Sequence, residues 1–157
     1  MNKKGFTLIE VIVTISIIGL LMGIMVPVVQ NTSNRVKYKN YKNLQNLIIQ
    51  ATIDYLNNSV EDEYSIDRIK PADETCESID NCSKRFTVGE ILDKNIYYSD
   101  VKVEVDGEEK LTIINPTNGK SMRNRTFWIY YDIETYSLKG YFSKGVDDEK
   151  IEGDLKQ

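Results

Sequence analysis

Residues 6–29 form a continuous apolar segment in which Glu10 carries the one charge. As a helix, these 24 residues would be about 36 Å long, enough to cross a hydrocarbon core of about 30 Å. A secretory signal peptide would have a shorter apolar region, roughly 7–15 residues, followed by a small-residue cleavage site. The segment is longer than that and no Ala-x-Ala site ends it. The sequence therefore predicts a membrane-spanning helix, and a plain single-span anchor remains an alternative.

Glu10 does not suit a plain anchor. An ionised side chain in the centre of a membrane helix costs about 2.5–3.5 kcal/mol on insertion scales, and less near its end. Glu10 lies about one turn inside the segment, so the pattern indicates a function for it. Its carboxylate could pair with a positive group of another molecule. The alternatives are a partner for the carboxylate in its own chain or a position of the carboxylate among lipid headgroups.

The residues around Glu10 form a specific pattern. A short basic stretch with Lys3 and Lys4 ends at Gly5, and Phe6 follows, so that Glu10 is the fifth residue after the glycine. This resembles the prepilin signature of type IV pilins and pseudopilins. The resemblance implies that a membrane peptidase cuts after Gly5 and that the new amine of Phe6 is methylated.

Three further residues of the apolar segment belong to the predicted assembly surface, together with Phe6 and Glu10. Gly19 and Gly23 form a small-xxx-small pair that lets helices approach closely, although glycine is also common in membrane helices. Pro27 lacks an amide hydrogen and should bend the helix. The resemblance implies that the Phe6 amine of one subunit pairs with Glu10 of a neighbour, and that residues 19–27 unwind in the filament.

The resemblance also implies a function, partners and a location. The expected protein is a structural subunit, major or minor, of a type IV pilus with roles in adhesion, motility or surface contact. Its partners would be other pilin subunits, the prepilin peptidase, the pilus assembly platform and the membrane. It would span the cytoplasmic membrane once and then enter an extracellular pilus. A pseudopilin of a type II secretion or DNA-uptake machine and a monomeric membrane-tethered binding module are the alternatives.

The remaining sequence predicts an α+β fold. Tyr41, Leu44, Ile48, Ala51 and Tyr55 recur at helical spacing and form one apolar stripe, widened by Leu47 and Leu56. We expect this helix to end at residues 57–59 and to pack against a four-stranded antiparallel meander. The predicted elements after it are a short helix near 88–94, opened by a capping box at Thr87 and Glu90, and strands at 101–105, 111–114, 127–133 and 137–142, with a turn at Asp106-Gly107. The predicted parts are a leader (1–5), a membrane or filament-core helix (6–29), a globular head (30–143) and an acidic tail (144–157).

Residues 60–86 are polar and predicted to be irregular. Cys76 and Cys82 lie close in this stretch and could form a disulfide at an extracytoplasmic location. Two free thiols are the alternative.

Composition excludes several kinds of chemistry. The chain of 157 residues contains no histidine and two cysteines, which excludes Ser-His and Cys-His nucleophile pairs and four-thiolate metal sites. We expect no enzyme activity and no cofactor.

The charge is distributed unevenly along the chain. Residues 1–58 carry six basic and two acidic side chains, whereas residues 59–157 carry a net charge of −8. This acidic head argues against nucleic-acid binding. The acidic tail could bind calcium, but a solvated tail is the better interpretation. The aromatic residues of the predicted sheet could stack on bases or sugars, although their spacing favours packing within the sheet: Trp128, Tyr130, Tyr131, Tyr136 and Tyr141.

Overall fold

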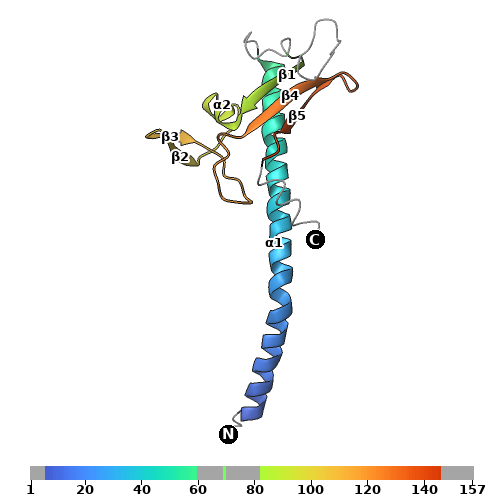
Figure 1. Ribbon diagram of the computed structural model, residues 1–157, viewed down its shortest axis with the longest axis vertical. Coiled ribbons are helices and arrows are strands. Elements are labelled where there is room, and N and C mark those ends of the chain that lie inside the picture. Colours follow the sequence, from blue (N-terminus) through green and yellow to red (C-terminus); the bar gives the residue numbers. More distant parts are fainter. Residues whose placement is uncertain (1–5, 60–68, 70–81, 146–157) are drawn as a thin grey trace, which may run out of the picture. The chain divides into compact units, whose positions relative to one another are not determined.

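The computed structural model describes residues 6–59, 69 and 82–145. The chain separates into two compact units, Met1–Lys37 and Tyr38–Gln157, which are described in turn. The elements in chain order are α1 (Leu8–Asn58), β1 (Ser83–Thr87), α2 (Val88–Asp93), β2 (Lys102–Val105), β3 (Glu108–Leu111), β4 (Thr126–Asp132) and β5 (Ser137–Phe142) (Figure 1). The α+β class predicted from the sequence is confirmed.

The described part of the first unit is the N-terminal part of α1. Every large apolar side chain described between Phe6 and Val29 is exposed, with exposed fractions from 43% at Val11 to 86% at Phe6. Apolar side chains cover the whole circumference of this helix. Packing on a sheet would cover one face of it and leave the other apolar faces exposed.

The second unit, hereafter the head, is built on a three-stranded antiparallel sheet. The strand order is β1-β4-β5. Phe86, Phe127 and Phe142 lie directly opposite one another across the strands. Their ring centroids are 5.7 and 5.0 Å apart, within the range of favourable aromatic pairs. Along β4, the residues on the same face as Phe127 are Ile129 and Tyr131, and all three are buried. They alternate with half-buried residues, as expected for a strand with one covered face.

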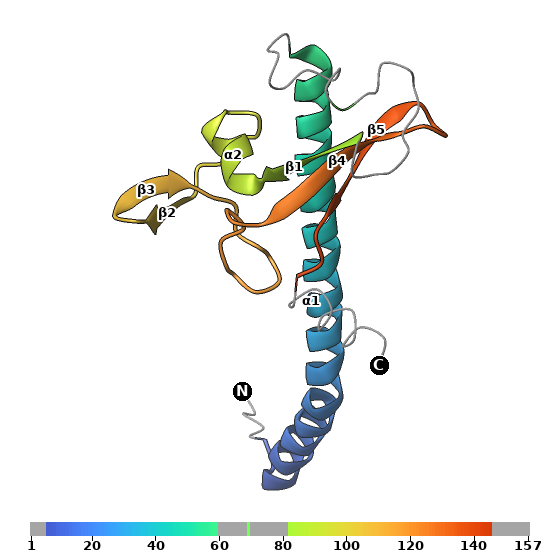
Figure 2. The same cartoon turned by 45° about the horizontal axis from the view of Figure 1, so that its top comes forward.

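The part of α1 from Tyr38 onward covers this sheet (Figures 1 and 2). The predicted apolar stripe is partly correct: Tyr41, Ile48 and Leu56 are fully buried. Leu47 is 57% exposed, so its predicted place in the stripe was wrong. The buried face is rotated and also contains Gln45, Ile49, Thr52 and Ile53. Thr52 can be buried because its hydroxyl donates to the carbonyl of Ile48 at 2.8 Å.

Gly140 on β5 allows the helix and the sheet to approach closely. A Cβ atom at this position would lie 2.7 Å from Ile129 Cδ1, 2.8 Å from Ile49 Cγ2 and 3.0 Å from the Trp128 carbonyl oxygen. These distances are shorter than ordinary van der Waals contacts. The absence of a side chain at residue 140 is therefore part of how α1 seats on the sheet.

The predicted four-stranded meander was wrong in its connectivity, because β2 and β3 form a separate two-stranded sheet. The turn between them was predicted correctly: Asp106 and Gly107 both have positive φ, 54° and 81°, as a type I′ turn requires. The second predicted strand, 111–114, begins where β3 ends at Leu111. Thr112 instead donates its backbone N–H to Val101, and Ile113 accepts from Met122. These bonds tie the segment to its neighbours on both sides rather than into the main sheet.

The strand β1 was missed, because its sequence continues the polar stretch before it. Of its five residues, Phe86 is the one that is buried. The remaining positions on β1 face partly or fully toward solvent, so the strand lacks the apolar alternation that would have revealed it.

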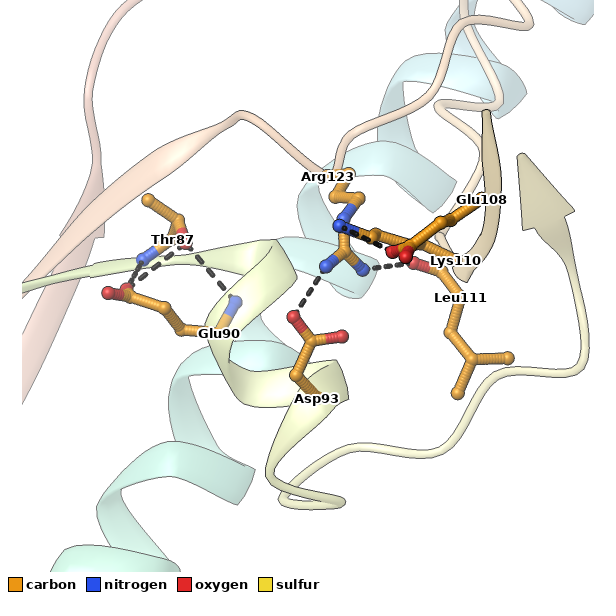
Figure 3. Close-up of polar contacts among 7 residues, drawn as sticks. All are labelled: Thr87, Glu90, Asp93, Glu108, Lys110, Leu111 and Arg123. Carbon is orange, nitrogen blue, oxygen red and sulfur yellow. Dashed lines mark hydrogen bonds and ion pairs between the residues drawn. The ribbon is translucent and has the colours of Figure 1, made fainter. Parts of the chain in front are cut away.

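The short helix α2 begins as predicted. Thr87 accepts from the Glu90 backbone N–H at 3.2 Å, and the Thr87 backbone N–H donates to Glu90 Oε2 at 2.6 Å (Figure 3). Arg123 then ties α2 to the β2–β3 hairpin, since it donates to Asp93 at 2.5 Å and to the Leu111 carbonyl at 2.7 Å (Figure 3). The contacts of this one guanidinium connect the end of α2 with the end of β3.

Candidate functional site

The N-terminal segment of α1 contains most of the predicted site residues. Phe6 precedes the helix and is exposed, and Glu10 lies in its first turn. Gly5 lies outside the described residues. The predicted cleavage after Gly5 and methylation of Phe6 stay predictions.

Glu10 takes part in a capping box at the start of α1. Its Oε2 atom accepts from the Thr7 backbone N–H at 2.8 Å and from the Thr7 hydroxyl at 2.7 Å. In return, the Glu10 backbone N–H donates to the Thr7 hydroxyl at 3.4 Å. The box satisfies donors that would otherwise be orphaned at a helix start. Sequence reasoning missed Thr7, although the Thr-x-x-Glu pattern at 7–10 is the same as the recognised one at 87–90.

Both donors of Thr7 bind the same oxygen of Glu10. A carboxylate has two oxygens and can accept several hydrogen bonds. The second oxygen, Oε1, has no hydrogen-bond partner within residues 6–59, 69 and 82–145. The capping box therefore orders the carboxylate on its own helix and leaves an acceptor for a further donor.

The hydroxyl groups in and next to the apolar segment are satisfied within the helix. Thr14 donates to the Val11 carbonyl at 2.8 Å, and Ser16 donates to the Ile12 carbonyl at 2.8 Å. Thr32, just after the segment, donates to the carbonyl of Val28 at 2.9 Å. Polar groups bonded in this way can enter an apolar environment at small cost. Glu10 is thus the one ionisable group of the segment.

Gly19 and Gly23 have no close neighbour among the described residues outside their own stretch of helix. A Cβ atom built on either residue has no neighbour within 4 Å. Contacts within the chain therefore do not require glycine at these two positions. Their predicted role in close helix–helix approach remains a prediction.

Pro27 lies within α1, which is assigned as one helix from Leu8 to Asn58. A proline in a helix interior removes one backbone hydrogen bond. The predicted bend at Pro27, and unwinding of residues 19–27 on assembly, stay predictions.

The second predicted site is the cysteine pair. Cys82 is buried, with 3% of its surface exposed. No cysteine is a free thiol in the part of the chain that the structure describes. Cys76 lies outside the described residues, so the predicted disulfide between the two stays a prediction.

The described residues offer little for other chemistry. Within the described ranges 6–59 and 82–145, and at residue 69, no three potential metal ligands are grouped together. The acidic tail considered for calcium lies beyond residue 145, outside these ranges. Of the aromatic residues, Tyr131 is buried in the sheet, Trp128 and Tyr130 are half-buried, and Tyr136 and Tyr141 are exposed.

The described chain contains one helix, α1, with a stretch long and apolar enough to cross a membrane, and this stretch is not buried. Residues 1–26 match the family model described as the prokaryotic N-terminal methylation motif. The N-terminal segment is therefore similar to that motif, and the match covers this part of the chain alone. The resemblance of this segment to the prepilin signature is thereby confirmed, and together with the apolar helix it fits membrane anchoring.

The chain is also similar to the competence protein ComGC of Bacillus subtilis (strain 168). The two share 38% identity over 48 residues, which is 31% of this chain and 49% of ComGC. The match thus spans about half the length of that relative. No solved structure matches the chain significantly.

Proposed function

We propose that this chain is a type IV pilin-like structural subunit that polymerises through the N-terminal segment of α1. The prepilin peptidase would cut after Gly5, and the new Phe6 amine would be methylated. The subunit would span the cytoplasmic membrane once before assembly by the pilus platform and then enter a surface filament. The observation that carries the proposal is the apolar circumference of residues 6–29, whose described large apolar side chains are all exposed.

The Oε1 oxygen of Glu10, which has no hydrogen-bond partner among the described residues, supports a specific pairing in the filament. Cleavage after Gly5 would create a positive amine on Phe6, next to the start of the apolar helix. The Oε1 atom of Glu10 on a neighbouring subunit could accept from that amine while Oε2 remains bonded to Thr7. A charge buried alone is costly, whereas a paired and hydrogen-bonded charge is tolerated. The pair would therefore fix the register between subunits.

Replacing Glu10 tests this proposal. In Glu10→Ala, the amine of the next subunit would be buried without a counter-charge, at about 3–5 kcal/mol. We expect incorporation into sheared surface filaments to fall by about a hundredfold or more. Processing, measured as the mass of the membrane-bound protein, should be unchanged. Glu104→Ala, which removes an exposed carboxylate of the head, is the matched control. Normal filaments from Glu10→Ala would contradict the pairing.

Similarity to ComGC favours a second candidate. The chain could be a pseudopilin-like subunit of a DNA-uptake filament, because the relative it matches is a competence protein. Deletion of this chain would then abolish transformation while surface fibres made of other subunits persist. Loss of fibres with normal transformation would instead support the pilus subunit.

A further inference from the structure

The residues that follow the apolar segment carry a concentrated positive charge. Arg35, Lys37 and Lys39 lie within five residues, and no acidic residue occurs between Glu10 and Asp54. All three cations are exposed on α1. Before them, residues 30–34 are polar and uncharged. The chain thus passes from apolar to neutral polar to cationic within about one dozen residues of helix.

Unlike several basic residues that follow α1, these three cations have no ion pair with any described group. None of them has an acidic partner within residues 6–59, 69 and 82–145. By contrast, Lys102 pairs with Glu109 at 2.8 Å, Arg123 with Asp93 at 2.5 Å, and Lys139 with Asp132. The positive charge at 35–39 is therefore not neutralised by described groups of the same chain.

We infer that Arg35, Lys37 and Lys39 bind the anionic headgroups of the membrane in which the apolar segment is anchored. This inference rests on the membrane-spanning part of the proposed function and does not require polymerisation. The occupant it specifies is a lipid surface rich in phosphatidylglycerol or a similar anionic lipid.

Helix geometry places the three cations at the right depth. At about 1.5 Å per residue they lie roughly 9, 12 and 15 Å beyond Val29. The headgroup layer outside the hydrocarbon core is about 5–7 Å thick. The Debye length at physiological salt is about 8 Å, so Arg35 and Lys37 lie within one screening length of that layer and Lys39 lies about one screening length from it. Lys42 would lie about 20 Å beyond Val29, and its ammonium group is over the Tyr38 ring, 5.4 Å from its centroid.

The measurement is the lipid preference of the full chain in phosphatidylcholine vesicles. Electron paramagnetic resonance gives the association constant of spin-labelled phosphatidylglycerol relative to spin-labelled phosphatidylcholine. We expect the wild-type chain to prefer the anionic lipid at low salt and to lose this preference at high salt. In the triple variant Arg35→Gln, Lys37→Gln and Lys39→Gln the preference should disappear. The upper bound for the change is about fivefold for each charge removed.

Two matched variants localise the effect. Replacing three exposed head lysines, Lys94, Lys102 and Lys120, by Gln removes the same charge far along the chain and should leave the preference intact. Lys42→Gln should reduce it less than any single change at 35, 37 or 39. A triple variant at 35–39 that keeps the wild-type preference would overturn the inference. An equal loss of anionic-lipid preference in the variant with the three head lysines replaced would also overturn the inference, because the net charge of the chain alone would then explain the preference.

Two further outcomes distinguish lipid binding by these cations from contact with another copy and from membrane anchoring alone. If the triple variant kept its lipid preference but failed to enter filaments, the cations would face the acidic head of another copy, and the inference would be overturned. Flotation of the same samples tests the membrane anchor itself. A wild-type chain that does not float with the vesicles would defeat the anchoring on which the proposed function depends. A chain that floats but shows no anionic preference would defeat the lipid inference alone.

Discussion

The two parts of α1 are both rich in apolar residues, but among the described residues only the second part has a face buried in a core. From Tyr38 to Asn58, one face of the helix enters a core with the sheet, and Tyr41, Ile48 and Leu56 are fully buried. From Phe6 to Val29, every described large apolar side chain remains exposed. The head buries one apolar face of its helix in its own core, whereas the apolar side chains of the N-terminal segment would need a bilayer or other subunits to cover them.

Glycines show the same difference at atomic detail. A Cβ at Gly140 would clash with the helix and the sheet of its own head, whereas a Cβ at Gly19 or Gly23 would meet open space. Glycine at 140 is thus explained by contacts within the chain. Glycine at 19 and 23 is not, and close approach of another helix would explain it.

The largest expected effect on head stability is that of Gly140→Ala. The added methyl group overpacks the contact with Ile49 and Ile129, which typically costs about 1–3 kcal/mol. Urea unfolding of the full chain in detergent, followed by the fluorescence of the single tryptophan, Trp128, measures this loss. An unchanged unfolding free energy would show that α1 does not seat on β5 as closely as described.

The two capping boxes provide the next test of the difference between the parts. Thr87→Ala removes the cap of α2 and should lower the unfolding free energy of the head by about 1 kcal/mol. Thr7→Ala removes the equivalent cap of α1, which lies outside the head core, and should leave that free energy unchanged. The same urea unfolding experiment compares them, and equal losses would mean that the two units fold together.

The double variant Gly19→Ala, Gly23→Ala should not destabilise the isolated chain. Alanine favours a helix over glycine by up to about 1 kcal/mol per residue, so helicity measured by circular dichroism should hold or rise. If neighbouring helices approach at these glycines, the yield of filaments should fall although the protein is processed and inserted normally. Wild-type yield would indicate that these residues are ordinary membrane-helix glycines.

The smallest expected effect is a pH dependence at the β4–β5 turn. Hydrogen bonds from Lys139 and Thr135 lower the pKa of Asp132 from its ordinary value of 3.8 to about 2. Because the folded pKa is the lower one, this contribution to stability is present above about pH 4 and is lost as the pH falls toward 2. Asp132→Asn should remove that part of the acid dependence of the unfolding free energy between pH 5 and pH 2. An identical pH profile in the variant would contradict the contribution.

Much of the architecture could be predicted from local patterns. The Asp106-Gly107 turn, the capping box at Thr87 and the end of α1 follow from short-range backbone chemistry that tertiary contacts did not override. The apolar segment followed from length and composition alone. The prepilin resemblance depended on the spacing of Gly5, Phe6 and Glu10.

The errors occurred where tertiary contacts decide. Leu47 is predicted in the buried stripe because helix periodicity cannot distinguish adjacent faces. Burial of Thr52 is not predicted, because a polar side chain is expected at the surface. The hydrogen bond of its hydroxyl to the Ile48 carbonyl is what permits its burial. The strand β1 was missed because Phe86 is its one buried side chain. The separate β2–β3 sheet could not be distinguished from a meander, since strand pairing is a long-range property.

The most direct test of the assembly proposal is the N-terminus and the location of the mature protein. Filaments sheared from cells should contain this chain as a component that begins at an N-methylated Phe6, as determined by intact-mass measurement and N-terminal peptide sequencing. A protein that still begins at Met1 and is recovered as a monomer from the membrane would contradict assembly through the N-terminal segment of α1.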